Sequence, residues 1–136
     1  EQAARAELML CLPAELGDVK AHWSVNWLGH VARAPFEYGF WLWWGHSIPN
    51  GDPPAPLAPD THMSGVVLME PKLFAESFKV LRHASGDPIR FFSMIPVHED
   101  EMQYKIAYGT EKLEELFENK GITELLDERR PSVLNN

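Results

Sequence analysis

Apolar residues near the start of the chain follow two different periods. Residues 6–12 form an almost continuous apolar run that ends at Pro13, which predicts a short buried strand, although the preceding alanines also permit a helix. Further on, apolar residues recur every four positions, which is the period of one helix face. This stripe contains Val19, Trp23, Trp27 and Val31, and it is widened by Leu28 and Ala32.

Residues with positional preferences mark the ends of this predicted helix. Asp18 precedes the stripe and can serve as the N-cap, because its carboxylate accepts hydrogen bonds from free N–H groups of the first turn. Pro35 follows the stripe, and the residue before a proline disfavours helical geometry. The pattern therefore predicts a helix over residues 19–34.

The middle of the chain has the period and the turn residues of strands. A strand is expected over residues 43–48, followed by a proline-rich but ordered loop over residues 49–59. Residues 64–69 form a β-branched apolar strand. Residues 78–81 and 89–97 predict the two arms of a hairpin, because the connection between them is rich in turn-forming residues.

The last third of the chain predicts two helices. The first covers residues 99–108, with Met102 and Ile106 on one side, and the second covers residues 110–120 and ends at Gly121. The second helix turns Leu113, Leu116 and Phe117 inward. The whole order predicts an α+β (α/β-like) fold, in which a mixed sheet of about five strands is covered by helices in a single domain over residues 1–136.

Composition and charge narrow the function. The chain has 136 residues, of which 45% are hydrophobic, and a net charge of −8. Direct nucleic-acid binding is not expected, because it requires a basic face. A basic protein partner fits the charge better. No run is long and apolar enough to span a membrane, and the single cysteine, Cys11, predicts a buried thiol in a cytoplasmic protein.

The tryptophans are unevenly distributed, since all five lie between Trp23 and Trp44. Trp23 and Trp27 are expected in the core. If the next segment is extended, Trp41, Trp43 and Trp44 cannot all point inward, because side chains of a strand alternate. At least one then lies at a surface or in a groove, where it can anchor a partner. The alternative is that a flanking N-terminal segment covers it.

Residues 45–54 read GHSIPNGDPP and predict a rigid, turn-rich shelf. Gly51 allows backbone angles that other residues avoid, and Asn50 and Asp52 can bond amides of their own loop. His46 is expected to be half-buried and hydrogen-bonded among the tryptophans. A rigid shelf favours binding, because little ordering entropy remains to be lost. Glu99 and Asp100 can favour the start of a helix or meet a basic partner.

Three stretches resemble the suppressor-of-fused (SUFU) family. Residues 45–54 are similar to the family's GHT-x-PNGDPP signature, with serine in place of threonine. Residues 27–38 resemble its helix ending in a proline and an aromatic-rich turn, and residues 95–102 resemble its strand-to-helix junction. Residues 121–123 and 130–133 also fit. The resemblance covers nearly the whole chain, which is identified as a member of the bacterial single-domain type.

This resemblance implies an interaction domain without a cofactor. Bacterial relatives are often regarded as immunity proteins, which implies sequestration of a protein partner, such as a basic toxin domain. Two-domain relatives imply a further possibility, peptide capture at a sheet edge. Family members usually carry a further N-terminal segment, so this chain is expected to lack its natural one.

An enzyme is the competing interpretation. His46, Asp52 and Glu99 could act on a small molecule or hold a metal near the aromatic residues. However, the six histidines form no HExxH motif, and the chain has no CxxC pair, no GxSxG elbow and no phosphate-binding glycine loop. Neither catalytic residues nor metal ligands are therefore predicted. The hypothetical binding residues are Trp41, Trp43, Trp44, His46, Asn50, Asp52, Glu99 and Asp100.

Overall fold

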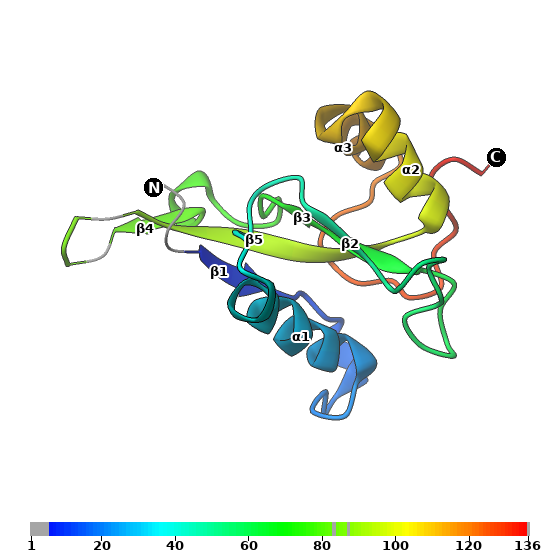
Figure 1. Ribbon diagram of the computed structural model, residues 1–136, viewed down its shortest axis with the longest axis horizontal. Coiled ribbons are helices and arrows are strands. Elements are labelled where there is room, and N and C mark those ends of the chain that lie inside the picture. The colour runs from blue at the N-terminus through cyan, green and yellow to red at the C-terminus, as the bar shows by residue number, and fades with distance from the viewer. Residues whose placement is uncertain (1–5, 83, 87, 136) are drawn as a thin grey trace.

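The computed structural model describes residues 6–82, 84–86 and 88–135 and shows a mixed sheet between helices (Figure 1). The long helix α1 lies on one side of the sheet, and α2 and α3 lie on the other. The elements in chain order are β1 (Ala6–Met9), η1 (Ala14–Leu16), α1 (Trp23–Tyr38), β2 (Ser47–Pro49), β3 (Gly65–Met69), η2 (Glu76–Phe78), β4 (Val80–Arg82), β5 (Pro88–Val97), α2 (Glu99–Tyr108) and α3 (Thr110–Asn119).

The long strand β5 organises the sheet. It pairs in parallel with β1 and in antiparallel fashion with both β3 and β4, while β2 pairs with the far edge of β3. The resulting order is β1-β5-β3-β2, with β4 pairing β5 beside this path. The expected α+β fold with five strands in a mixed sheet is confirmed, and so is the predicted hairpin, whose arms are β4 and β5.

Two hydrophobic cores lie on opposite faces of the sheet, because side chains alternate along the central strands. From β3, Val66 and Leu68 join the core beneath α1, whereas Val67 and Met69 join the core beneath α2 and α3. All five residues of β3 are buried. A strand covered on both faces is expected to be continuously apolar, as this one is.

The helix α1 differs from the prediction at both ends. It begins at Trp23, where the side chain of His22, not of Asp18, accepts the capping hydrogen bond from the Ser24 N–H. It then continues through Pro35 to Tyr38. The helix ends at Gly39, whose left-handed backbone (φ 71°) lets its N–H donate to the Pro35 carbonyl. The predicted end of the helix at Ala34, the residue before Pro35, was therefore wrong.

Three local predictions were also wrong. The strand expected over residues 43–48 is confined to β2, because Trp43 and His46 close a turn with a 3.1 Å hydrogen bond. Met102 and Ile106, expected on one side of their helix, do not share an environment, since Met102 is buried and Ile106 is 68% exposed. Cys11, expected to be buried, is only half-buried, and it forms an isolated β-bridge with Leu125.

The predicted end of α3 is confirmed. Leu113 and Phe117 are buried, and Leu116 packs against the same core. Gly121 has a positive φ of 71°, and the Ile122 N–H donates to the Phe117 carbonyl at 2.8 Å. This geometry satisfies a carbonyl that the helix end would otherwise leave free.

Candidate interaction groove

The helix α1 carries two apolar stripes. One stripe consists of Trp23, Trp27, Val31 and Ala34. The first three pack in the core between α1 and the sheet, and Ala34 is buried. The other lies on a different side of the helix and faces a groove instead. Its residues are Val25, Leu28, Gly29, Ala32, Pro35 and Phe36. Gly29 and Ala32 contribute the smallest side chains of this wall.

The rest of the groove is built from β1 and from the link that follows α1. Ala6, Glu7 and Leu8 form one side, and Phe40, Trp41 and Leu42 form another. The cavity volume is about 700 Å³, which is within the range of ligand-binding clefts. The groove is therefore lined by β1 and by α1 with the link that directly follows it.

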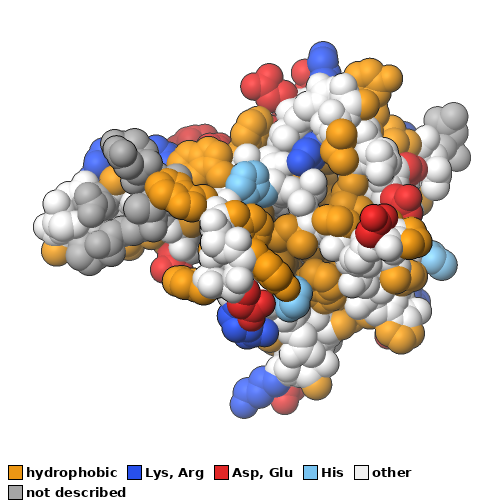
Figure 2. Space-filling view, in the orientation of Figure 1, with side chains coloured by type: hydrophobic (Ala, Val, Ile, Leu, Met, Phe, Trp, Pro, Cys, Tyr) orange, Lys and Arg blue, Asp and Glu red, His pale blue; other side chains and the backbone are white. Residues whose placement is uncertain are grey.

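Large aromatic side chains at the rim are exposed to solvent. Phe36 is 90% exposed and Trp41 is 52% exposed, while Leu42 forms a buried floor. Figure 2 shows hydrophobic side chains exposed at many places on this face of the molecule, between polar and charged ones. Clustered exposed aromatics next to a concave apolar surface are typical of an interaction site.

The three clustered tryptophans have different environments. Trp41 lies at the groove, as the prediction of at least one surface tryptophan requires. Trp43 packs edge-on against Phe92 at a ring distance of 5.3 Å, with the Arg90 guanidinium 5.6 Å from its ring. Trp44 is half-buried, and its Nε1 donates to Glu114 at 3.4 Å. Only Trp41 among them is available as an exposed anchor.

The predicted shelf is a braced loop. The Asn50 side-chain amide donates to the carbonyls of Ala55 and Pro56, both at 3.0 Å, and the Ala55 N–H donates back to the Asn50 carbonyl. These bonds hold the loop together between residues 50 and 56. Asp52 is exposed beyond the end of β2, next to a cis peptide bond with Pro53.

His46 is exposed, not half-buried as expected, because it lies in the turn before β2. Its pKa is lowered, first by partial desolvation and then by the nearby positive charge of Lys105. The ammonium group of Lys105 donates to the Gly45 carbonyl at 2.5 Å and to the Ser47 hydroxyl at 2.9 Å. Burial lowers the pKa of Lys105. This lysine ties α2 to the turn that carries His46.

The acidic residues at the start of α2 divide into separate roles. Glu99 is exposed, and the Asp100 carboxylate accepts a hydrogen bond from the Ser132 hydroxyl at 2.8 Å. Glu101 is fully buried and forms a two-pronged ion pair with Arg130, with distances of 2.7 and 2.8 Å. Desolvation opposes ionisation of Glu101, but Arg130 and the backbone N–H groups of His98 and Val133 outweigh it and lower its pKa.

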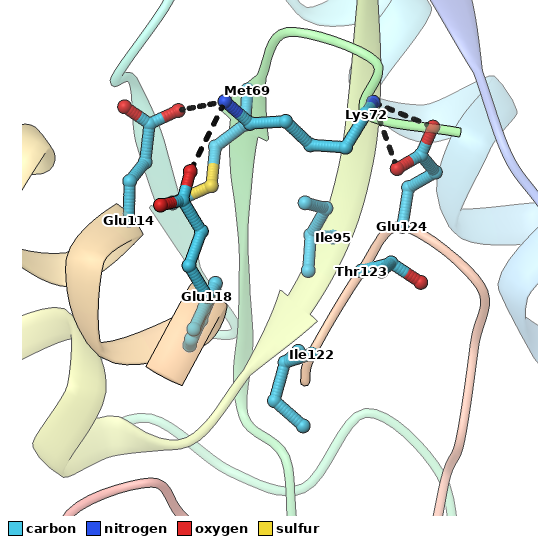
Figure 3. Close-up of a pocket in the computed structure, with 9 residues that line it drawn as sticks. Met69, Lys72, Ile95, Glu114, Glu118, Ile122, Thr123 and Glu124 are labelled. Atoms are coloured by element: carbon cyan, nitrogen blue, oxygen red, sulfur yellow. Dashed lines mark hydrogen bonds and ion pairs between the residues drawn. The ribbon is translucent and has the colours of Figure 1, made fainter. Parts of the chain in front are cut away.

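A small pocket lies on the α3 side of the sheet (Figure 3). Its volume is only about 20 Å³. Lys72 spans it: the ammonium lies 3.8 Å from carboxylate oxygens of Glu114 and Glu118, and the backbone N–H donates to the Glu124 carboxylate. Glu124 is itself buried. These polar groups satisfy one another and leave little room for a ligand.

The residues of the enzyme interpretation are not brought together as a metal site. His46 precedes β2, Asp52 follows it, and Glu99 begins α2. Across residues 6–82, 84–86 and 88–135, no group of three or more His, Cys, Asp or Glu side chains could hold a metal ion. None of the helices in these ranges has both the length and the hydropathy needed to cross a membrane.

Trp41 was one of the hypothetical binding residues, but the other residues that line the groove were not predicted from the sequence. The available signal was the width of the helical stripe, since Leu28 and Ala32 extend it beyond what one packed face requires. Phe36 gave no signal, because the helix was predicted to end before it. The contribution of β1 depends on tertiary packing and has no local pattern.

Comparison with known proteins gives the family. The profile described as "Suppressor of fused protein (SUFU)" matches residues 1–131. No curated protein matches the chain. A putative SUFU homologue from Neisseria gonorrhoeae has a similar structure, with a TM-score of 0.71 and 19% identity over 96% of this chain and 64% of that one.

Two further solved structures share the fold. One is described as the Sufu–Fu complex (TM-score 0.64, 15% identity, 82% of this chain and 45% of that one), and the other is Drosophila Suppressor of Fused (TM-score 0.65, 16% identity, 82% and 25%). The chain thus spans less than two thirds of each of these proteins. With the profile matching almost its full length, the chain belongs to the suppressor-of-fused family.

Proposed function

We propose that this chain is a protein-binding domain that holds an apolar segment of its partner in the groove between α1, β1 and the link after α1. The observation that carries the proposal is the groove itself, about 700 Å³ in volume and rimmed by exposed Phe36 and Trp41. The family supports it, because one solved relative is described as a complex of Sufu with Fu.

The groove is suited to an apolar anchor. Large aromatic side chains contribute much contact area with few rotatable bonds, so binding orders little that is free beforehand. The floor is already fixed by Leu42, which is buried in the core. Partner side chains that enter the groove would therefore displace water from Leu28 and Trp41 without rearranging the fold.

The charge of the chain favours a basic partner. The net charge is −8, and Glu7 and Glu37 are exposed at the groove and at the end of α1. We propose that the partner is an intracellular basic protein, such as a toxin domain that this chain sequesters as an immunity protein. His46, Asp52 and Glu99 are exposed outside the groove and are candidates for further polar contacts with such a partner.

Affinity capture from an extract of the native host, with two matched variants, tests this proposal. Ala32→Trp places a large ring in the hollow of the groove, whereas Ala107→Trp adds the same ring to an exposed position of α2. Proteins retained by the wild type and by Ala107→Trp but lost with Ala32→Trp are candidate partners. The expected loss of affinity of the purified partner is at least about tenfold.

The salt dependence of the purified complex tests the charge of the partner. Raising the ionic strength from about 0.05 M to about 0.5 M should weaken the complex, because screening shortens the range of the attraction.

Equal retention of the same proteins by Ala32→Trp and the wild type would contradict binding in the groove. Groove-dependent binding that does not change with salt would contradict only the basic partner.

A further inference from the structure

We propose that the groove is also a binding site for a small amphipathic anion, an aliphatic carboxylate whose chain lies in the groove and whose head pairs with Arg33. Such a ligand is not a segment of a protein, so this site goes beyond the proposed function. Because the ligand and the partner would use the same walls, each should exclude the other. This regulatory role alone rests on the proposed function.

The cation of the site lies against the α1 wall. Gly29 is one of the lining residues, and the Arg33 guanidinium lies over it, since a β-carbon at Gly29 would be 3.3 Å from Arg33 Nη1. Long side chains of a helix point back toward its N-terminus, which explains how Arg33 reaches a residue four positions before it. The missing side chain at Gly29 therefore lets the guanidinium lie at the edge of the groove.

The charge of Arg33 is unpaired within the described part of the chain. Its side chain has no ion pair or hydrogen bond there, whereas Arg130 pairs with Glu101 and Arg82 donates to the Gly86 carbonyl. A guanidinium group suits a carboxylate, because two of its N–H groups match the two oxygens. Arg33 is thus free to bind the head of a ligand that the groove holds by its chain.

The interior of the groove suits a hydrocarbon chain. Glu7 lines the groove, but the side chains of Ala6 and Leu8 on either side of it pack on the core beneath α1. Since side chains of a strand alternate, the Glu7 carboxylate points to the opposite face of the sheet and does not repel the head. The other described lining residues carry no charge.

The dimensions of the groove indicate the length of the chain. The α1 wall extends from Gly29 to Phe36, which is about 10 Å along the helix and matches an extended chain of about eight to ten carbons. The cavity of about 700 Å³ has room for such a chain and its head. Phe36 and Trp41 are exposed at the C-terminal end of this wall and can cover the chain.

Calorimetric titration of the purified chain with decanoate tests the site, at an ionic strength of about 0.1 M, where remote negative charges are screened. From hexanoate to decanoate, each added CH2 group should tighten binding by about three- to fourfold, because more apolar surface is buried. Ala32→Trp fills the groove and should abolish binding. Ala107→Trp adds the same ring to an exposed position of α2 and should bind decanoate as the wild type does.

Arg33→Gln separates the role of the head from that of the chain. It should weaken decanoate by about two- to fivefold, which is the range of an exposed ion pair, and leave the uncharged decan-1-ol unchanged. Arg82→Gln makes the same change of charge on β4, outside the lining of the groove, and should affect neither ligand. Denaturation midpoints near that of the wild type check that both variants keep the fold.

Competition with the partner recovered by the groove-dependent capture tests the regulatory role. Decanoate at about nine times its own Kd should weaken the partner by about tenfold, because only the free chain remains available to the partner. Decanoate that binds without weakening the partner would overturn the shared use of the groove.

The remaining outcomes distinguish this inference from the proposed function. Absence of decanoate binding would overturn the carboxylate site and leave the partner proposal intact. The same conclusion would follow if Arg33→Gln left decanoate unchanged, or weakened decanoate and decan-1-ol equally. Decanoate binding that depends on Ala32 and Arg33 as expected, without any partner that needs the groove, would support the site and contradict only the proposed function.

Discussion

The two faces of the sheet differ in how their side chains are covered and paired. On the α2 and α3 face, buried charges find partners: Glu101 pairs with Arg130, and Glu124 accepts from the backbone of Lys72 and Leu73. On the α1 face, the apolar groove remains open and Phe36 is almost fully exposed. One face is closed by specific polar contacts, and the other keeps an uncovered apolar surface.

Under the proposed function, the two faces have separate roles. Buried ion pairs are sensitive to the loss of one partner, because the remaining charge is left in a poorly solvated environment. Exposed aromatics, in contrast, contribute little to folding and can contribute much to association. We therefore expect substitutions on the α2 and α3 face to change stability, and substitutions in the groove to change binding.

The largest effect is expected for Arg130→Met. This change leaves the Glu101 carboxylate buried without its guanidinium partner, and it should reduce the free energy of unfolding by about 3–5 kcal/mol. Urea denaturation measures the loss. In the double variant Glu101→Met and Arg130→Met no buried charge remains, so it should lose less than the single variant. A double variant at least as unstable as the single one would contradict this explanation.

Gly65→Ala should have the next largest effect. A β-carbon at Gly65 would overlap the sulfur of Met102 on α2, so the helix or the side chain must shift. The expected cost is about 1–3 kcal/mol in the free energy of unfolding. Adding Met102→Ala should make the combined loss smaller than the sum of the two single losses. Strict additivity in this double-mutant cycle would show that the two groups do not compete for space.

Acid should destabilise the closed face through Glu101. Its pKa is lower in the folded protein than in the unfolded chain, where a glutamate titrates near about 4.3. The stabilisation is therefore present above that pH and is lost as the pH falls through the folded pKa. Between about pH 6 and pH 3, the wild type should lose more stability than Glu101→Gln. Parallel pH profiles of the two proteins would contradict the lowered pKa.

The smallest effect on stability is expected in the groove. Phe36→Ser and Trp41→Ser remove exposed aromatic surface and should change the free energy of unfolding by less than about 1 kcal/mol. Each should nevertheless weaken the partner by about tenfold or more, as measured by calorimetry with the purified partner. A large stability loss with unchanged affinity would reverse the proposed roles of the two faces.

The sequence predicted features that depend on local pattern. The continuous apolar run of β3 and the inward residues Leu113 and Phe117 of α3 follow from periodicity, and Gly121 marks the helix end for steric reasons. The asparagine of the shelf also acts as expected, since Asn50 bonds within its own loop. These cases need only neighbours within a few residues.

Other features depend on contacts between distant segments and could not be predicted. Glu101 and Arg130 are 29 positions apart, and no spacing rule connects them. The helix α1 passes Pro35 because Gly39 provides the actual stop, which a rule about prolines alone does not include. The groove arises only when β1 is placed beside Leu28 by pairing with β5.

Amide hydrogen exchange of the chain, with and without the partner recovered through the groove-dependent capture, tests the central claim most directly. We predict that protection on binding is concentrated in residues 6–9 and 25–42, which form β1, α1 and the following link. Exchange in α2 and α3 should change little. Protection concentrated in α2 and α3, with the groove segments unchanged, would contradict the assignment of the α1 face as the interaction surface.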